Sequence, residues 1–247
     1  MPRVFEHQSF EDLNDDLLLP WPFRKTPSRF EDLEFRHCTF LRCHLSLSRT
    51  PNRRTVVSHV NVLNCRAIGC DLNQAIVEDV LVDGLSTPLL SSWGAVFKHV
   101  TLRNRIGSLL LNHLVTPSQP DSRTQHMFAV ANAAYYTQVD WALDIREAEF
   151  EGDADLRGIP GTLIRRDPTT QVLVTRAKAL EGKWQQLPLE RTYWPTAIEF
   201  FLRDNAWDST VLVAPKWFRT SPTNPYTYQD LVDGLHLLRD EGVAELD

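Results

Sequence analysis

The sequence predicts a mainly β fold with a small α+β part at its C-terminal end, and three observations support that prediction. Apolar side chains recur every five residues over much of the first half of the chain. This period stops at an Ala-rich segment near residue 121 and returns in two units from residue 148. After Gly161, short apolar runs alternate with helical periodicity, which is typical of an α+β unit.

The composition is that of an ordinary globular protein. The chain has 247 residues, of which 43% are apolar and 23% are charged, close to the average. No apolar run approaches the roughly 20 residues of a membrane span, and the first 20 residues contain five acids and no visible secretory signal. Four cysteines in such a chain favour a reducing compartment. We therefore expect a cytoplasmic protein without a membrane partner.

Charge is distributed unevenly along the chain. Residues 1–117 carry 13 Lys and Arg against 12 Asp and Glu, whereas residues 118–247 carry 13 against 20. The second half is therefore acidic, with a net charge of −7. Basic residues form no cluster of the kind that nucleic-acid binding requires. We expect no nucleic-acid partner.

The five-residue period is the strongest signal in the sequence. From residue 28, the large apolar positions are Phe30, Phe35, Phe40 and Leu45. Two positions before them stand Ser28, Leu33, Cys38 and Cys43. In the next run the first position is occupied by Val60, Cys65, Cys70, Ala75, Val80 and Leu85, and the second by Val62, Ala67, Leu72, Val77, Val82 and Thr87. Because a period of five fits neither a helix nor a simple strand, we predict five-residue sides that each bury two residues and end at a corner.

Two later units, AEFEG at 148–152 and ADLRG at 154–158, follow the same pattern. The repeat resembles the pentapeptide-repeat family, whose loose consensus is A-(D/N)-L-X-X. The resemblance implies a short right-handed quadrilateral β-helix with roughly 20 residues per coil and about four coils over residues 28–117. The alternative is a set of ordinary short strands whose spacing arose by chance.

The remaining segments of the first two thirds are predicted as a cap, a loop and an insertion. Solenoid ends need caps, so residues 1–27 are expected to form an N-terminal cap, with a short helix and an extended stretch over 9–23. Residues 49–57 are expected to form a loop that leaves one corner. Residues 118–161 are predicted as a helical insertion, with a helix from Asp121 to about Val139, followed by a return to the β-helix.

Residues 162–247 are predicted to form an α+β unit that packs on the end of the solenoid. We expect a β-hairpin formed by TLIRR and QVLVT around the turn DPTT. A helix begins near Pro195, in the first turn where proline is tolerated. A strand follows at 209–215, and a final helix runs from Thr227 to Glu241 with Gly242 as its stop.

The cysteines and adjacent histidines are compatible with two interpretations. Cys38, Cys43, Cys65 and Cys70 form two C-x4-C pairs, with His37 and His44 close by. This composition is thinkable for zinc. All four thiols, however, occupy the first buried position of the repeat, whereas the histidines occupy outward positions. We therefore predict structural cysteines, no metal site and no cofactor.

Two groups of residues are candidate partner-binding sites. The first is an alternating series of five acids, which an extended segment would present on one face: Glu147, Glu149, Glu151, Asp153 and Asp155. Such a ridge is solvated and neutralised by nearby arginines, binds a partner, or holds a divalent cation. The second group consists of Trp207, Trp217 and Phe218, which lie near predicted loops in an aromatic-rich segment.

No motif typical of a nucleotide-binding loop, a nucleophile elbow or a zinc hydrolase occurs in the sequence. We therefore predict a non-enzymatic protein-binding solenoid, with an inhibitor or immunity-type role as its specific form. The family resemblance implies an alternative, in which the protein mimics DNA and binds a type II topoisomerase. A third possibility is an enzyme with its site at the junction of the solenoid and the C-terminal unit.

Overall fold

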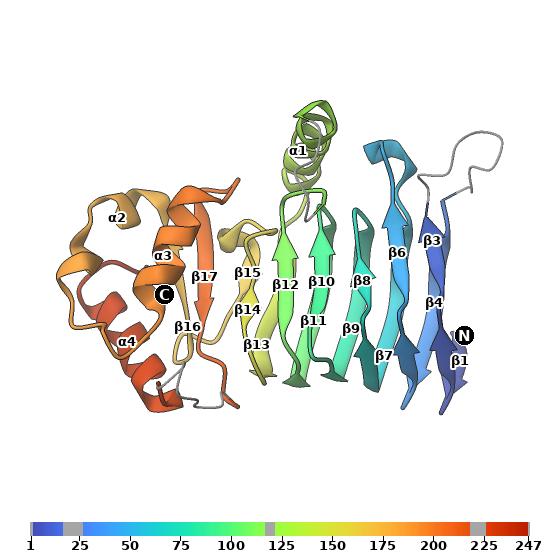
Figure 1. The fold of residues 1–247 in the computed structure, drawn as a ribbon, viewed down its shortest axis with the longest axis horizontal. Helices are drawn as coiled ribbons and strands as arrows, with labels where there is room; N and C mark the ends of the chain where they lie inside the picture. Colours follow the sequence, from blue (N-terminus) through green and yellow to red (C-terminus); the bar gives the residue numbers. More distant parts are fainter. Residues whose placement is uncertain (1, 17–26, 117–121, 218–225, 247) are drawn as a thin grey trace.

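Two sheets of parallel strands form the larger part of the molecule (Figure 1). The structure is a computed structural model, and it describes residues 2–16, 27–116, 122–217 and 226–246. Within these residues the fold is mainly β, with parallel sheets and a few helices. The larger sheet is formed by β1 (Arg3–Glu6), β4 (Arg29–Arg36), β7 (Val56–Ile68), β9 (Ile76–Ser86), β11 (Val96–Ile106), β13 (Leu143–Phe150) and β15 (Ile164–Arg165), with β2 (Ser9–Glu11) and β5 (Thr39–Leu41) beside them.

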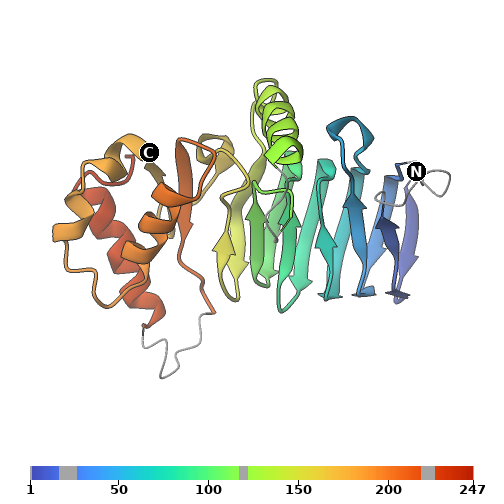
Figure 2. The ribbon, with the colours of Figure 1, turned by 45° about the horizontal axis from the view of Figure 1, so that its top comes forward.

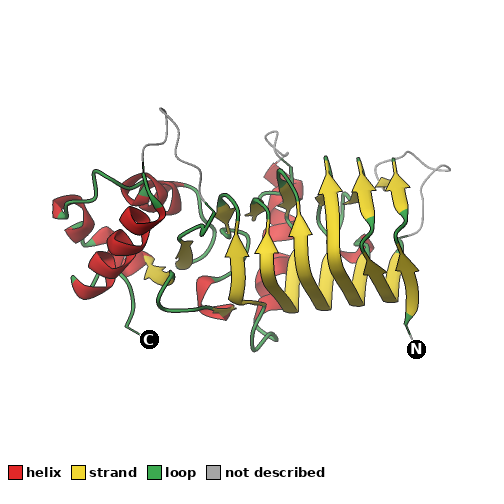
Figure 3. Ribbon diagram, turned by 90° about the horizontal axis from the view of Figure 1, so that it is seen from below, coloured by secondary structure: helices red, strands yellow, loops and turns green. Residues whose placement is uncertain are grey.

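The second sheet contains six strands and has the same direction of growth. Its strands are β3 (Asn14–Asp16), β6 (His44–Leu47), β8 (Asp71–Leu72), β10 (Leu90–Trp93), β12 (Leu109–Asn112) and β14 (Ala154–Asp155). The chain passes from the larger sheet to the smaller one and back, and it advances by one strand on each return (Figure 3). We call residues 3–165 the parallel-sheet region.

The register between neighbouring strands advances by a constant number of residues where the connections are short. Val56 of β7 pairs with Ile76 of β9, and Ile76 pairs with Val96 of β11. Each return to the larger sheet therefore takes 20 residues. The offset is larger at three places: Arg29 pairs with Val56, Arg3 with Leu33, and Val100 with Leu143.

All three longer connections lie on the same path, from a strand of the smaller sheet to the next strand of the larger one. They join β3 to β4, β6 to β7 and β12 to β13. The second contains the short helix η1 (Pro51–Arg53), and the third contains the helix α1 (Ser122–Tyr136) (Figure 2). The loop predicted at 49–57 and the helix predicted from 121 are thus confirmed.

Left-handed backbone conformations mark the bends. Through β7, β8 and β9 a residue with positive φ occurs at every fifth position: His59, Asn64, Gly69, Gln74, Asp79 and Gly84. This conformation is costly for most side chains but is tolerated by Gly and, to a lesser degree, by Asn, Asp and His. The fifth position of the repeat therefore has its own residue preference, which the sequence analysis did not identify.

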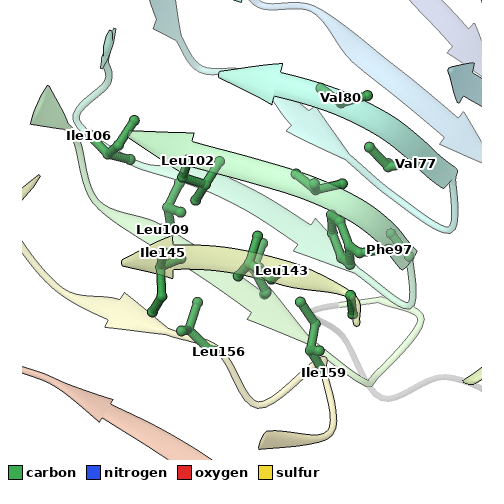
Figure 4. Close-up of a cluster of buried hydrophobic side chains, with 14 of the residues drawn as sticks. Val77, Val80, Phe97, Leu102, Ile106, Leu109, Leu143, Ile145, Leu156 and Ile159 are labelled. Atoms are coloured by element: carbon green, nitrogen blue, oxygen red, sulfur yellow. The ribbon is translucent and has the colours of Figure 1, made fainter. Parts of the chain in front are cut away.

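The side chains of the two predicted repeat positions point into the space between the sheets. Val60, Cys65, Cys70, Ala75, Val80 and Leu85 are all buried, as the period predicts. Figure 4 shows the same arrangement further along, where Phe97, Leu102, Ile106 and Leu143 converge from neighbouring strands. The four cysteines are buried and free, and burial raises the pKa of the Cys43 and Cys65 thiols, as expected of inert structural thiols.

The N-terminal segment differs from the prediction. Residues 9–16 were expected to belong to a short helix, but they form β2 and β3, which pair in parallel with β5 and β6. The parallel sheets thus begin at Arg3 and not at residue 28. Phe5 stacks on Phe35 with ring centres 5.2 Å apart, and this burial of aromatic surface outweighs the weak helical preference of the acidic segment. The predicted cap residues from Leu17 to Phe23 lie outside the described residues.

A buried polar contact attaches α1 to the parallel-sheet region. The guanidinium group of Arg54 donates a hydrogen bond to the side-chain oxygen of Asn132 in α1, and it lies 4.9 Å from the ring centre of Phe128. Arg54 is 6% exposed. Burial lowers its pKa to about 10. The side chain of Asn132 also donates to the carbonyl of Gly94, so this residue connects η1, α1 and the smaller sheet.

The C-terminal unit, residues 166–246, covers the end of the parallel-sheet region (Figures 1 and 2). It contains β16 (Gln171–Thr175), β17 (Ser209–Val213), α2 (Arg176–Leu180), α3 (Trp194–Arg203) and α4 (Tyr228–Asp240), with η3 (Lys183–Gln186) between α2 and α3. The predicted helices at 195 and 227, the strand at 209 and the stop at Gly242, whose φ is 74°, are confirmed. No helix in the described ranges is both long and apolar enough to cross a membrane.

The predicted hairpin at 162–175 is wrong, because its two halves pair with different partners. β15 extends the larger parallel sheet beside β13, whereas β16 pairs in antiparallel fashion with β17. Both faces of the β16–β17 sheet are buried: Leu173, Val211 and Val213 pack on the parallel-sheet core, whereas Val172 and Leu212 pack on the helices. This two-sided burial explains the uninterrupted apolar character of both strands.

Candidate functional site at the junction of the two units

A pocket of about 530 Å³ lies where the C-terminal unit meets the parallel-sheet region. One side is formed by residues 153–157, in and after β14. The other side is formed by α3 and β17, together with Tyr193 and Tyr226. We call it the junction pocket. Its size is within the range of ligand-binding pockets.

Close backbone contact brings the two units together beside this pocket. Gly161, at the start of η2 (Gly161–Leu163), lies so near β17 that an added Cβ would be 2.8 Å from the nitrogen of Thr210. The amide of Thr162 donates to the hydroxyl of Ser209 at 3.2 Å. Glycine is therefore required at this position by the close approach of the two backbones, and the geometry of the junction is well defined.

Arg157 is the central cation of the pocket. It donates two hydrogen bonds to the carboxylate of Asp155, of 2.9 and 2.6 Å, and contacts the carboxylate of Asp204 at 3.3 Å. Its guanidinium carbon lies 5.7 Å from the ring centre of Phe200. The hydrogen bonds to Asp155 raise the pKa of Arg157. Arg157 is thus fully engaged by two carboxylates.

Asp153 differs from Asp155 because its carboxylate forms no ion pair with any described residue. Its side chain is exposed, and it lines the same pocket. The backbone carbonyl of Asp153 accepts a hydrogen bond from Leu109 at 2.9 Å, which holds the residue in place. The junction pocket therefore carries an excess of negative charge.

Aromatic side chains form much of the pocket wall. The ring of Tyr193 lies 4.4 Å from that of Trp194 and 6.3 Å from that of Tyr226, centre to centre. Burial raises the pKa of Tyr193, so its hydroxyl stays neutral and donates to the carbonyl of Val213 at 3.4 Å. Phe200 is 43% exposed at the pocket edge. Aromatic faces next to carboxylates suit a cationic or amphipathic guest.

The five predicted acids are not presented on one face, because the chain turns between β13 and β14 and these strands belong to different sheets. The structure separates them into three groups. Asp153 and Asp155 line the junction pocket, and Glu147 is exposed on β13. Glu149 forms an ion pair with Lys216, and Glu151 with Arg105. The prediction of one continuous ridge is therefore wrong.

Trp217 lies beside the second of these groups. Its ring centre is 4.9 Å from the guanidinium carbon of Arg105, and its amide donates to the carbonyl of Phe150 at 3.2 Å. The hydrogen bond from Lys216 lowers the pKa of Glu149. Trp217 is 45% exposed, consistent with the predicted surface role, but every charge next to it has an opposite partner.

Trp207 has a different environment from the one expected of an interface residue. It packs against the parallel-sheet core, and its ring meets Tyr136 of α1 edge-on at 5.4 Å. Trp207 therefore joins α1 to the C-terminal unit. Phe218 lies outside the described residues.

Sequence reasoning did not identify His113, which lies near the pocket. Burial lowers its pKa, and the charges of Asp204, Arg157 and Asp155 act on it. Its Nδ1 is buried without a hydrogen-bond partner. His113 does not line the pocket, whose described lining contains no histidine and none of Glu147, Glu149 and Glu151. This arrangement offers no acid–base pair to a bound substrate.

Comparisons with known proteins found no matching family model, no matching curated protein and no matching solved structure.

Proposed function

We propose that the parallel-sheet region is a right-handed quadrilateral β-helix of the pentapeptide-repeat type. Two measurements support this assignment. Successive strands of the larger sheet are offset by 20 residues where the connections are short, and left-handed residues recur at every fifth position. A bend every five residues and a return every 20 residues correspond to four sides per coil.

We further propose that the protein is a non-enzymatic binding protein that receives a basic loop of a partner protein in the junction pocket. The observation that carries this proposal is the combination of aromatic walls with the carboxylate of Asp153, which forms no ion pair within the described residues. Guanidinium and ammonium groups both pair with carboxylates and stack on aromatic faces. Aromatic pockets also contribute most of the binding energy in many protein interfaces.

An inhibitor or immunity-type role is the form of this function that agrees with the charge distribution. Residues 118–247, which include both sides of the pocket, have a net charge of −7. A negative field steers a basic partner to the site and raises its association rate. The close contacts at Gly161 keep the pocket walls in place, so little conformational entropy is lost on binding.

A peptide titration tests the pocket directly. We expect an acetylated tetra-arginine amide to bind the wild-type protein, and Asp153→Lys to weaken binding at least ~10-fold, because the substitution replaces attraction by repulsion. Glu190→Lys is the matched control, since Glu190 is exposed and does not line the pocket. Equal binding by the two variants, or equal binding of a tetra-glutamate peptide, would contradict the proposal.

The same variants make a partner search specific. A protein captured from a cell lysate by the wild type and by Glu190→Lys, but not by Asp153→Lys, would be a ligand of the junction pocket. A protein captured equally by all three would bind elsewhere on the surface and would count against this site.

The DNA-mimic alternative ranks lower because acids on the outer surface of the sheets are paired with arginines. Arg103 donates to Asp83 at 2.8 Å, and Arg146 donates to Asp144 at 2.6 Å. A row of phosphate-like charges needs carboxylates without such partners. We expect no inhibition of gyrase supercoiling at micromolar protein. Inhibition at that concentration would reverse the ranking.

A further inference from the structure

An apolar cavity of about 510 Å³ lies between the two sheets of the parallel-sheet region. Its wall is formed by inward-facing side chains from β1 to β13. Almost all of these side chains are apolar, and the polar ones are Arg3, Arg29, Asp71 and Ser92. We call this space the interior cavity. It is separate from the junction pocket, and the two share no lining residue.

The cavity follows from the sizes of the inward-facing residues in successive strands. Phe35 of β4 is in register with Val62 of β7, which is in register with Val82 of β9. Phe40 of β5 is likewise in register with Ala67. Larger side chains return in β11, where Leu102 pairs with Val82. The middle strands therefore carry small residues between layers with large ones, and the difference in volume remains as space.

The exposure of the inward-facing side chains agrees with this explanation. Phe35, Phe40, Val62 and Val82 pack against the core, yet each is only partly buried. In a core at normal packing density such residues have almost no accessible surface. Because they face the space between the sheets, their accessible surface is the wall of the interior cavity.

An empty cavity of this size is unfavourable. The free-energy cost of a cavity grows with its volume, and at this volume it is comparable to the whole stability of a typical domain. Apolar cavities exclude water but take up apolar molecules of suitable shape. An apolar guest therefore gains more here than at an open surface.

The shape of the cavity indicates an extended guest. The lining extends over six neighbouring strands of the larger sheet, from β1 to β13, so its length is at most about 24 Å at the usual strand spacing. A volume of 510 Å³ over about 24 Å corresponds to a mean cross-section of about 20 Å². This is the width of a single chain of methylene groups.

A cation lies at the N-terminal end of the cavity. Arg3 is exposed on β1, the edge strand of the larger sheet, and lines the cavity with its guanidinium carbon 4.8 Å from the ring centre of Phe5. Arg29 is already paired with Glu31 at 2.6 Å, whereas Arg3 forms no ion pair in the described part of the chain. A carboxylate at this end would therefore meet a cation that has no competing acid.

We propose that the interior cavity binds a long-chain fatty acid, with its hydrocarbon chain between the two sheets and its carboxylate at Arg3. This site is independent of the function proposed for the junction pocket.

Displacement of a fluorescent fatty acid tests the proposal on the full chain after co-purified lipid has been removed. We expect cis-parinaric acid to bind and palmitate to displace it. Val82→Phe fills the cavity, so it should weaken palmitate binding at least ~10-fold and raise the melting temperature. Val130→Phe, on the exposed surface of α1, is the matched control and should change neither quantity.

The two parts of the proposal have separate readouts. Arg3→Glu should weaken palmitate binding several-fold and leave hexadecanol binding unchanged, because only palmitate carries a charge. If Val82→Phe and the milder Val62→Leu both lower the melting temperature, the core is already filled and the cavity assignment is overturned. Failure of palmitate to displace the probe from the wild type, or displacement only by ring compounds of benzene size, would overturn the fatty-acid assignment.

Discussion

The sulfur of Cys70 accepts a hydrogen bond from the backbone amide of Cys43 at 3.4 Å and lies 3.5 Å from the carbonyl oxygen of Phe40, to which it donates. Cys65 has the same relationship to the amide of Cys38, at 3.3 Å. Both pairs are separated by 27 residues, which is the register offset between β4 and β7. The thiols therefore fill space in the core and also satisfy backbone groups of the neighbouring strand.

Replacing Cys70 tests this inward register. Cys70→Arg would place a charge among apolar side chains and should lower the free energy of unfolding by more than ~3 kcal/mol. Cys70→Ala loses the sulfur and its weak hydrogen bonds and should cost roughly 1–2 kcal/mol. The control is Val130→Arg at a 57% exposed position, where we expect a change within about 0.5 kcal/mol. Equal melting temperatures for Cys70→Arg and Val130→Arg would show that the register is misassigned.

A β-branched residue at a left-handed bend should be destabilising. His59 has a φ of 52° and an exposed side chain, so His59→Val mainly tests the backbone conformation. We expect a loss of ~1–2 kcal/mol in urea unfolding. His59→Gly should not be destabilising, and Lys98→Val, at a position without positive φ, serves as the control. Similar stabilities for His59→Val and His59→Gly would count against a sterically required bend.

Loss of the Asn132 side chain should destabilise the attachment of α1. Asn132→Ala removes the acceptor of Arg54 and leaves a buried cation with fewer hydrogen bonds, which we expect to cost more than ~2 kcal/mol. Arg54→Met removes the charge while keeping the length of the side chain, so the double variant should lose less stability than Asn132→Ala alone. Thermal melts of the three variants, with the exposed His126→Ala as control, give this order. If the losses were simply additive, Arg54 and Asn132 would be independent of one another.

Acid should remove the contribution of Asp144 to stability. Burial alone would raise the pKa of this carboxyl, but hydrogen bonds from Arg146 outweigh burial and hold the pKa below its usual value. Because the folded-state pKa is the lower one, this stabilisation is present above about pH 4 and is lost as the pH falls through the folded-state pKa. Between about pH 6 and pH 2, the melting temperature of Asp144→Asn should therefore fall less than that of the wild type. Parallel curves for the two proteins would argue against this ion pair as a source of stability.

The inward-facing positions were predictable because the core imposes a size pattern on the sequence. Burial at Val60, Cys65 and Val80 follows from a five-residue period that persists over six units. The N-terminal strands were missed because Phe5 and Phe10 provide only two units, surrounded by acids that also suit a helix start. The residues at the bends, such as Asn64 and Asp79, carry a real but weaker signal, since several residue types tolerate positive φ.

The junction pocket was predictable only in part. Asp153 and Asp155 stood out as acids, but their neighbours Tyr193, Phe200 and Tyr226 come from a segment whose position depends on how the C-terminal unit docks. That docking depends on both faces of the β16–β17 sheet being buried, and the same apolar strands were equally compatible with a local hairpin. His113 carried no motif, because its environment is created by residues more than 40 positions away.

The three long connections that join the smaller sheet to the larger one separate the length of the chain from the spacing of the strands. The connection from β12 to β13 includes the whole of α1, yet Val100 and Leu143 still lie side by side as neighbouring strand residues. Evolution can therefore lengthen, shorten or exchange segments along this one edge without disturbing the order of the layers. In protein engineering, the same edge is a ruler: a peptide grafted into each of these connections would be displayed in one row, at intervals set by the sheet.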